Sequence, residues 1–441
     1  MALSQQEANH IFQRLRSGAV PERGLETFAV GIERPRGEIG RMLRAAREDK
    51  AGDVKFLRGG YGCGKTFMSN LAILDAKREN FVTSFVVVSD NDLHFHKFDE
   101  LYRKVVNGLS TSACPQGALG DIVDRWIGSL EESLIKTFGV SEDDPNFDEK
   151  VLRKLDEQLA ALTGGRAPAD MVRVIRELFR QKQMGNLPNA AGLLSWLSGS
   201  QNVASSIKKL AGIKGDIGSD VAMDYLRGVL EICKSAGYSG LMIVIDEAET
   251  ILRMKGDVRG KSLNGIRQIV DASGGLPGLL WLFTGTPQFF DDRRGVKSLE
   301  PLDERIRFQK FGEVASLKQP QLELKPFDRE RLIGVALRLR SLHPDAAPEM
   351  MEHRMPKEFI EKLVDKVNEG FHGNVGVVPR QFLRKLVNIM DILVENPEQD
   401  VWLLLGFEAE NLSAEEKSAI DGKPLPLPDD ETIFEGAGVQ M

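Results

Sequence analysis

The chain has few cysteines and no long hydrophobic run. Its three cysteines, Cys63, Cys114 and Cys233, are too few and too far apart for a disulfide framework or a zinc cluster, so we expect a reducing compartment. The longest apolar runs, 241–245 and 279–283, fall well short of the roughly 18 residues that span a bilayer. The start, 1–16, is polar and lacks the apolar core of a secretory signal. These absences predict a cytoplasmic protein with no membrane partner.

An excess of basic residues is also missing. The formal net charge is -7, which argues against a protein whose whole surface is basic and binds nucleic acid, although a local basic patch could still bind DNA. With 42% hydrophobic and 28% charged residues, the composition is that of an ordinary globular protein. The length of 441 residues allows two or three compact units.

A glycine-rich motif is the strongest signal present. It fits the pattern G-x-x-x-x-G-K-[ST] through Gly59, Gly60, Tyr61, Gly62, Cys63, Gly64, Lys65 and Thr66. A short β-rich run, 54–58, precedes it and a helix-favouring stretch, 67–79, follows, so strand, loop and helix fall in the required order. We expect backbone N–H groups to surround the phosphates of ATP, Lys65 to reach the β and γ phosphates, and the Thr66 hydroxyl to hold Mg²⁺. Cys63 is expected to be a spacer.

An apolar run that ends in two carboxylates is the second signal. Residues 241–245 followed by Asp246 and Glu247 are typical of a buried parallel strand that delivers acids to its C-terminal edge. We expect Asp246 to hold Mg²⁺ through its water shell and Glu247 to polarise the water that attacks the γ phosphate. The alternative is a helix that happens to begin with Asp-Glu.

Three further positions follow in chain order. The next apolar run, 278–283, ends near Thr284 and Thr286, either of which could contact the γ phosphate or simply cap the strand. Arg305 is a candidate catalytic cation, although Arg307 could serve equally and both could form surface ion pairs. Arg380 follows Pro379 at the start of a helical run, where it could point at the phosphates or into solvent.

Taken in this order, these elements resemble AAA+ ATPases of the group that contains origin-recognition and initiator-type proteins. The resemblance implies that Thr284 is a sensor-1 residue, that Arg305 is an arginine finger reaching a neighbouring subunit of a homo-oligomer, and that Arg380 is a sensor-2 residue. The segment 28–39 resembles the one that packs on adenine in that group.

A closer resemblance is to the BrxD family of ATP-binding proteins of BREX phage-defence systems. Three segments carry it: 15–25, the glycine-rich motif 59–66 (the P-loop) with Arg58 directly before it, and 246–250 together with 262–268. The resemblance implies antiviral defence and work beside a helicase and other defence proteins.

The separation of Lys65 from Asp246 is far longer than a few short βα units need, so a segment is inserted. Residues 121–232 are rich in helix formers, and 151–162 and 171–183 have amphipathic helical spacing, broken at 164–168 and 185–188. We therefore predict an α/β AAA+ P-loop fold with a parallel sheet, a large helical insertion and a C-terminal helical lid. The expected units are the N-terminal part of the core (1–110), the insertion (111–232), the rest of the core (233–318), the lid (319–407) and an acidic, proline-rich tail (408–441).

Two functional hypotheses remain open. The first is an oligomeric ATPase that acts as a motor or switch on DNA or a DNA-bound complex. The basic segments 205–215 and 253–261 are the candidate contacts to DNA phosphates, and we expect 253–261 to be a loop. The second is an adaptor that binds ATP with little turnover and holds a helicase or nuclease partner. The insertion could bind a partner or DNA, or form only an extra helical layer.

Overall fold

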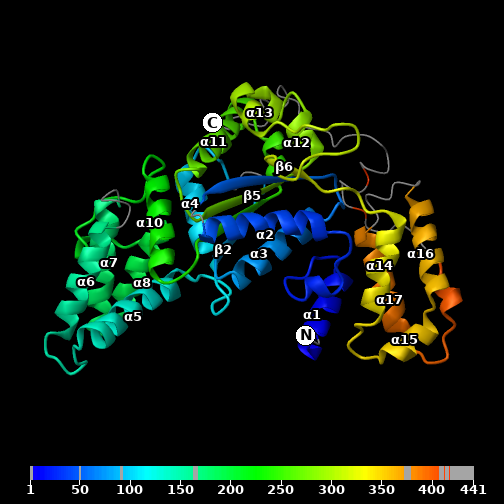
Figure 1. The fold of residues 1–441 in the computed structure, drawn as a ribbon, viewed down its shortest axis with the longest axis horizontal. Coiled ribbons are helices and arrows are strands. Elements are labelled where there is room, and N and C mark those ends of the chain that lie inside the picture. Colours follow the sequence, from blue (N-terminus) through cyan, green and yellow to red (C-terminus); the bar gives the residue numbers. More distant parts are fainter. Residues whose placement is uncertain are drawn as a thin grey trace, which may run out of the picture.

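A six-stranded sheet forms the centre of the molecule in the computed structural model, which describes residues 3–48, 51–89, 93–161, 167–371, 379–406, 412 and 417 (Figure 1). The strand order is β3-β2-β4-β5-β1-β6. The strands are β1 (Asp53–Arg58), β2 (Val82–Val87), β3 (Leu109–Ser110), β4 (Leu241–Asp246), β5 (Leu279–Gly285) and β6 (Gln321–Glu323). Neighbouring strands are parallel except for β3, which pairs antiparallel with β2.

The two central strands, β4 and β5, are buried along their whole length. Their alternate residues enter two separate apolar clusters, one on each face of the sheet. Ile243 and Trp281 belong to the first cluster, whereas Met242 and Leu280 belong to the second. A continuous apolar run is thus what a strand covered on both faces requires, and the sequence prediction of buried parallel strands is confirmed.

Helices cover both faces of the sheet. Outside the insertion and the lid, the described α-helices are α1 (Gln5–Arg16), α2 (Glu33–Glu48), α3 (Lys65–Arg78), α4 (Phe98–Asn107), α11 (Gly256–Ser273), α12 (Pro287–Asp291) and α13 (Glu300–Ile306). One sequence prediction here is wrong: the stretch 253–261 is not a loop, because α11 begins at Gly256. Helix α4 ends at Asn107, and Leu109 and Ser110 after it pair with β2.

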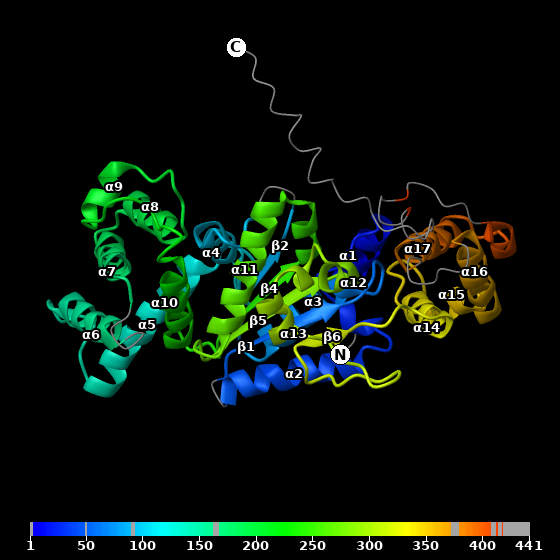
Figure 2. The same cartoon turned by 90° about the horizontal axis from the view of Figure 1, so that it is seen from above.

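The helical insertion extends from one end of the sheet (Figures 1 and 2). It consists of α5 (Leu119–Phe138), α6 (Phe147–Ala161), α7 (Ala169–Gln183), α8 (Leu187–Leu197) and α9 (Ser205–Leu210), and α10 (Ala222–Ser235) leads back to β4. The break expected at 185–188 is present, since Asn186 caps the start of α8. Residues 164–166 of the other expected break lie outside the described residues.

The lid lies at the opposite end and consists of α14 (Arg329–Arg340), α15 (Pro348–Arg354), α16 (Lys357–Gly370) and α17 (Pro379–Glu395) (Figures 1 and 2). One expected boundary needs correction: β6 falls inside the range 319–407 assigned to the lid, yet it pairs with β1 and so belongs to the sheet. The acidic tail lies outside the described residues except for Leu412 and Lys417.

The first helix, α1, packs on α17 rather than on the sheet. Arg16 of α1 forms an ion pair with Asp391 of α17 at 2.7 Å, and the Phe12 ring meets the His343 ring edge-on. The strand order and the two helical regions confirm the predicted architecture: an α/β P-loop fold with a mostly parallel sheet, a helical insertion and a C-terminal helical lid.

Candidate functional site

The glycine-rich loop between β1 and α3 has the backbone that the motif predicts. Gly62 and Gly64 adopt left-handed conformations, with φ of 77° and 84°, which side chains with a Cβ rarely tolerate. Helix α3 begins at Lys65, and no side chain caps its first N–H groups. Burial raises the pKa of the Cys63 thiol, which keeps the thiol uncharged, and its role as a spacer stays a prediction. The loop thus leads into a helix N-terminus without a side-chain cap, an arrangement suited to an anion.

Lys65 is buried beneath this loop. Its Nζ donates hydrogen bonds to the carbonyl oxygens of Gly59 at 3.0 Å and Gly60 at 3.2 Å. The Tyr61 ring centroid lies 5.3 Å from the same nitrogen, and the Glu249 carboxylate lies 3.7 Å from it. The lysine ammonium is therefore surrounded by acceptors from its own chain.

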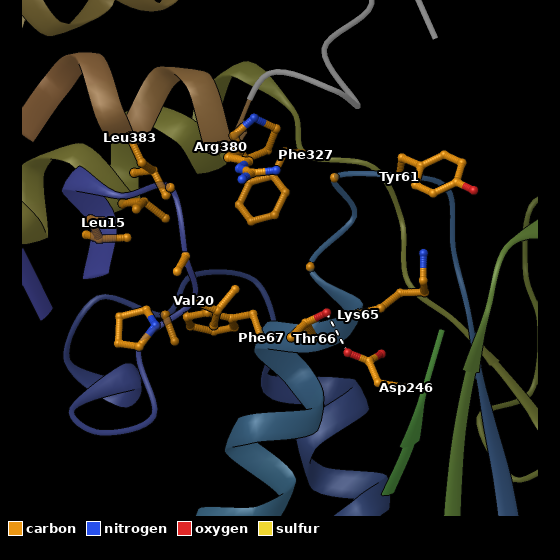
Figure 3. A pocket seen from close by; sticks show the side chains of 18 of the residues that line it. Leu15, Val20, Tyr61, Lys65, Thr66, Phe67, Asp246, Phe327, Arg380 and Leu383 are labelled. Atoms are coloured by element: carbon orange, nitrogen blue, oxygen red, sulfur yellow. Dashed lines mark hydrogen bonds between the residues drawn. The ribbon is translucent and has the colours of Figure 1, made fainter. Parts of the chain in front are cut away.

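A chain of hydrogen bonds joins the loop to the ends of β4 and β5. The Thr66 hydroxyl donates to one oxygen of Asp246 at 2.8 Å, and the Thr284 hydroxyl donates to the other at 2.5 Å (Figure 3 shows the first bond). The Glu247 backbone N–H in turn donates to Thr284 at 3.0 Å. Of the two threonines that the sequence left open, Thr284 belongs to this network, whereas Thr286 caps α12 through a bond from the Phe289 N–H.

Glu247 has an unusual backbone. Its φ of 61° and ψ of 41° lie in the left-handed region, which costs a residue with a side chain of order 1 kcal/mol or more. The bond from its N–H to Thr284 helps to hold this conformation. Strain of this kind is often found at functional sites. Glu247 lines the same cavity as Lys65 and Thr66.

Sequence reasoning assigned no role to Glu249, which the structure places in this cavity. It lies in η3 (Ala248–Arg253), directly after β4, and its side chain is 10% exposed. Burial raises the pKa of the Glu249 carboxyl, and the nearby Lys65 ammonium opposes that shift. The signal in the sequence was a second acid two positions after Glu247.

The cavity has a volume of about 440 Å³ and two chemically different ends (Figure 3). At the polar end lie Tyr61, Gly62, Gly64, Lys65, Thr66, Asp246, Glu247, Glu249, Thr250 and Arg253. The apolar end combines the N-terminal segment, α3, the lid and the linker before it, and includes Val20, Phe28, Val30, Ile32, Phe67, Phe327, Leu332, Val335 and Leu383. Phe28 and Ile32, from the segment expected to pack on adenine, both line this end, and adenine packing itself stays a prediction. Phe327, which sequence reasoning missed, follows β6 and lines the same cavity as Arg380 (Figure 3).

The arginine candidates lie in different places. Arg380, at the start of α17, lines the cavity. Arg305, on α13, is not among the cavity residues and instead pairs with Asp271 and the Pro301 carbonyl. Arg307, which follows the end of α13, pairs with Asp303 of that helix at 2.8 Å. Of these three arginines, Arg380 alone lines the cavity.

The donor set suits a hard cation held jointly with a ligand. The Thr66 hydroxyl and the Asp246 carboxylate supply oxygen atoms, and Mg²⁺ in proteins takes one or two such donors and completes its shell with water and phosphate oxygens. Over the described part of the chain, no group of three or more His, Cys, Asp or Glu residues could hold a metal by itself. None of the helices in the same part is long and apolar enough to span a membrane.

A family model described as BREX system ATP-binding protein BrxC/D matches residues 3–408 of the chain. No curated protein matches the sequence. Among solved structures, one of Drosophila ORC bound to DNA is similar, with 12% sequence identity and a TM-score of 0.40; the match covers 92% of this chain and 66% of that chain. This chain thus spans just under two thirds of its neighbour's length. The family match, by contrast, includes every residue of the cavity.

Proposed function

The chain belongs to the BREX system ATP-binding protein BrxC/D family, and we propose that it hydrolyses Mg-ATP in the cavity between the P-loop and the lid. The resemblance inferred from the sequence agrees with this family. The proposed role is that of a motor or switch acting on DNA or on a DNA-bound complex in phage defence. ATP is the proposed ligand, with its triphosphate at the polar end of the cavity and its adenine at the apolar end.

The observation that carries the proposal is the hydrogen-bond chain from Thr66 through Asp246 and Thr284 to the Glu247 backbone. It fixes a hydroxyl, a carboxylate and a general-base candidate at one edge of the sheet. Simple nucleotide binding needs the loop and Lys65, whereas hydrolysis also needs a group that orients water. A glutamate held in a strained conformation beside the loop is suited to that task.

Each residue then has a defined task. The loop N–H groups and Lys65 bind the phosphates, and Glu247 orients and polarises the attacking water. Arg380 reaches from the lid to stabilise charge on the phosphates. Thr66 and Asp246 would hold Mg²⁺, which neutralises phosphate charge when bound.

Arg305 is proposed to act on a neighbouring subunit of a homo-oligomer. Its place on α13, outside the cavity of its own chain, is compatible with action in trans.

The basic segments 205–215 and 253–261 give weaker support for DNA contact. Lys208 is paired with Asp216 at 2.6 Å, and Arg259 is buried with a bond to the Met254 carbonyl. Exposed Lys209, Lys214 and Lys255 are therefore the stronger candidates.

Steady-state phosphate release tests the proposal. We would compare the wild type with Lys65→Ala and Glu247→Gln, each with and without double- and single-stranded DNA, beside nucleotide titrations. We expect turnover by the wild type only, with Glu247→Gln still binding ATP. Stimulation by DNA would identify the effector.

Binding without turnover, under every condition and with candidate helicase or nuclease partners added, would overturn the ATPase proposal. The adaptor function would then take its place. Failure of the wild type to bind any nucleotide would overturn both.

A further inference from the structure

The Glu249 carboxyl group is a buried acid that the proposed mechanism does not use. Its side chain is only 10% exposed, and it lines the nucleotide cavity. Its Oε1 lies 3.7 Å from the Lys65 Nζ, and its Oε2 has no hydrogen-bond partner among the described residues. A buried polar atom without a partner requires an explanation, because such an atom has lost its hydrogen bonds to water without replacing them.

Lys65 is the cation nearest to this acid. The lysine amine donates to two carbonyls of its own loop, Gly59 and Gly60, and faces Glu249 on another side. These partners hold the ammonium in place within the loop. To contact a β or γ phosphate, the amine has to give up some of them.

When ionised, Glu249 adds negative charge to a site that is already acidic. Burial is the main cause that raises the pKa of its carboxyl, the Lys65 ammonium lowers that pKa, and the nearby Asp246 and Glu247 raise it further. Arg253, which lines the same cavity, is a further cation at this end. An incoming triphosphate therefore meets three carboxyl groups and competes with one of them for Lys65.

We propose, on the basis of the function above, that Glu249 is a positioning residue that holds Lys65 in competition with the nucleotide phosphates. Lys65 is shared between a resident carboxylate and the ligand. Each added phosphate pulls the lysine further from Glu249, so the residue limits affinity more strongly for a triphosphate than for a monophosphate. The advantage to an ATPase is a site that releases and reloads nucleotide rather than retaining it.

The test is the number of phosphates on the ligand. Affinities of the full chain for a non-hydrolysable ATP analogue, ADP and AMP are measured with Mg²⁺ for the wild type and Glu249→Gln, which keeps the side-chain shape and removes the charge. A pH of about 8 favours the ionised carboxyl, since burial raises its pKa. We expect Glu249→Gln to bind the triphosphate about tenfold more tightly, ADP less so, and AMP within about twofold of the wild type.

Two variants serve as controls. Glu249→Asp keeps the charge and should remain close to the wild type. Glu300→Gln removes an exposed carboxylate on α13, outside the cavity lining, and should change none of the three affinities. Thermal unfolding without nucleotide checks that each variant is folded.

The outcomes separate this inference from the proposed function. If the wild type binds nucleotide but Glu249→Gln changes the three affinities equally or not at all, the positioning role of Glu249 is wrong and the ATPase proposal stands. Weaker triphosphate binding by a folded Glu249→Gln would likewise overturn it. If the wild type binds none of the three nucleotides, the proposed function itself fails.

Discussion

Two helical regions flank the sheet, and they differ in their relation to the cavity. The lid contributes Leu332, Val335, Pro379, Arg380 and Leu383 to its lining. The insertion helices α5 to α9 contribute none of the described lining residues. Both regions are amphipathic helices with buried apolar faces, so composition alone does not distinguish them.

The difference lies in how each region connects to the strands. The lid follows β6 through a linker that carries Phe327, whereas the insertion returns to β4 through α10. Tyr225 of α10 packs against Tyr102 of α4 and Trp196 of α8, with ring centroids about 6 Å apart. A ligand in the cavity would thus contact the lid directly, whereas the described contacts link the insertion to the cavity through the core.

Among substitutions in the two helical regions, the largest expected effect is a loss of ATP turnover when the lid arginine, Arg380, is replaced. Arg380→Ala should lower ATP turnover about a hundredfold, because a cation that stabilises charge developing on the phosphates is lost. The measurement is steady-state phosphate release at saturating ATP.

The matched control is Arg384→Ala. Arg384 lies one turn further along α17 and also approaches Gly18, yet it does not line the cavity. Its replacement should change turnover by no more than about twofold. Equal losses for the two variants would mean that Arg380 acts only through lid packing.

An intermediate effect, on nucleotide affinity, is expected from replacing an aromatic residue beside the lid, whereas replacing one in the insertion should have none. Phe327→Leu should weaken nucleotide binding about five- to tenfold, since a ring that lines the cavity is lost. Phe138→Leu, at the exposed end of α5, should leave affinity unchanged. Nucleotide titration of both variants checks this contrast, and a comparable loss in Phe138→Leu would contradict it.

The smallest effect on nucleotide affinity should come from the core of the insertion. Leu155 of α6 is fully buried, so Leu155→Ala should destabilise the helices around it by about 2–5 kcal/mol. Hydrogen exchange should rise in α5, α6 and α7, while nucleotide affinity stays within about twofold of the wild type. Faster exchange in the P-loop together with weaker binding would show that the two regions are coupled more tightly than the packing indicates.

The elements predicted best were those with local causes. The P-loop and the β4 acids are recognisable because glycine conformation and strand burial leave a pattern within a few residues of sequence. The insertion was predictable from helical periodicity and from the unexpected distance between the two motifs. The family resemblance is confirmed over residues 3–408, whereas the roles of the individual site residues remain predictions.

The features that sequence reasoning missed depend on distant contacts. Strand β6 has only three residues, and its identity depends on pairing with β1, more than 260 positions earlier. Phe327 enters the cavity because the linker after β6 passes the P-loop, where its ring approaches Gly64. Glu249 was visible as an acid, but its significance comes from the distance to Lys65, which no spacing in the sequence reveals.

The packing of α1 on α17 has a consequence for how the molecule reaches its native state. The Arg16–Asp391 pair joins residues 375 positions apart, which is among the slowest kinds of contact to form. On the ribosome, α1 is synthesised long before α17, so the apolar side chains of Ile11, Phe12 and Leu15 remain without this partner while most of the chain is made. The nucleotide cavity, which Leu15 and Leu383 line together, is therefore among the last features to be completed during folding.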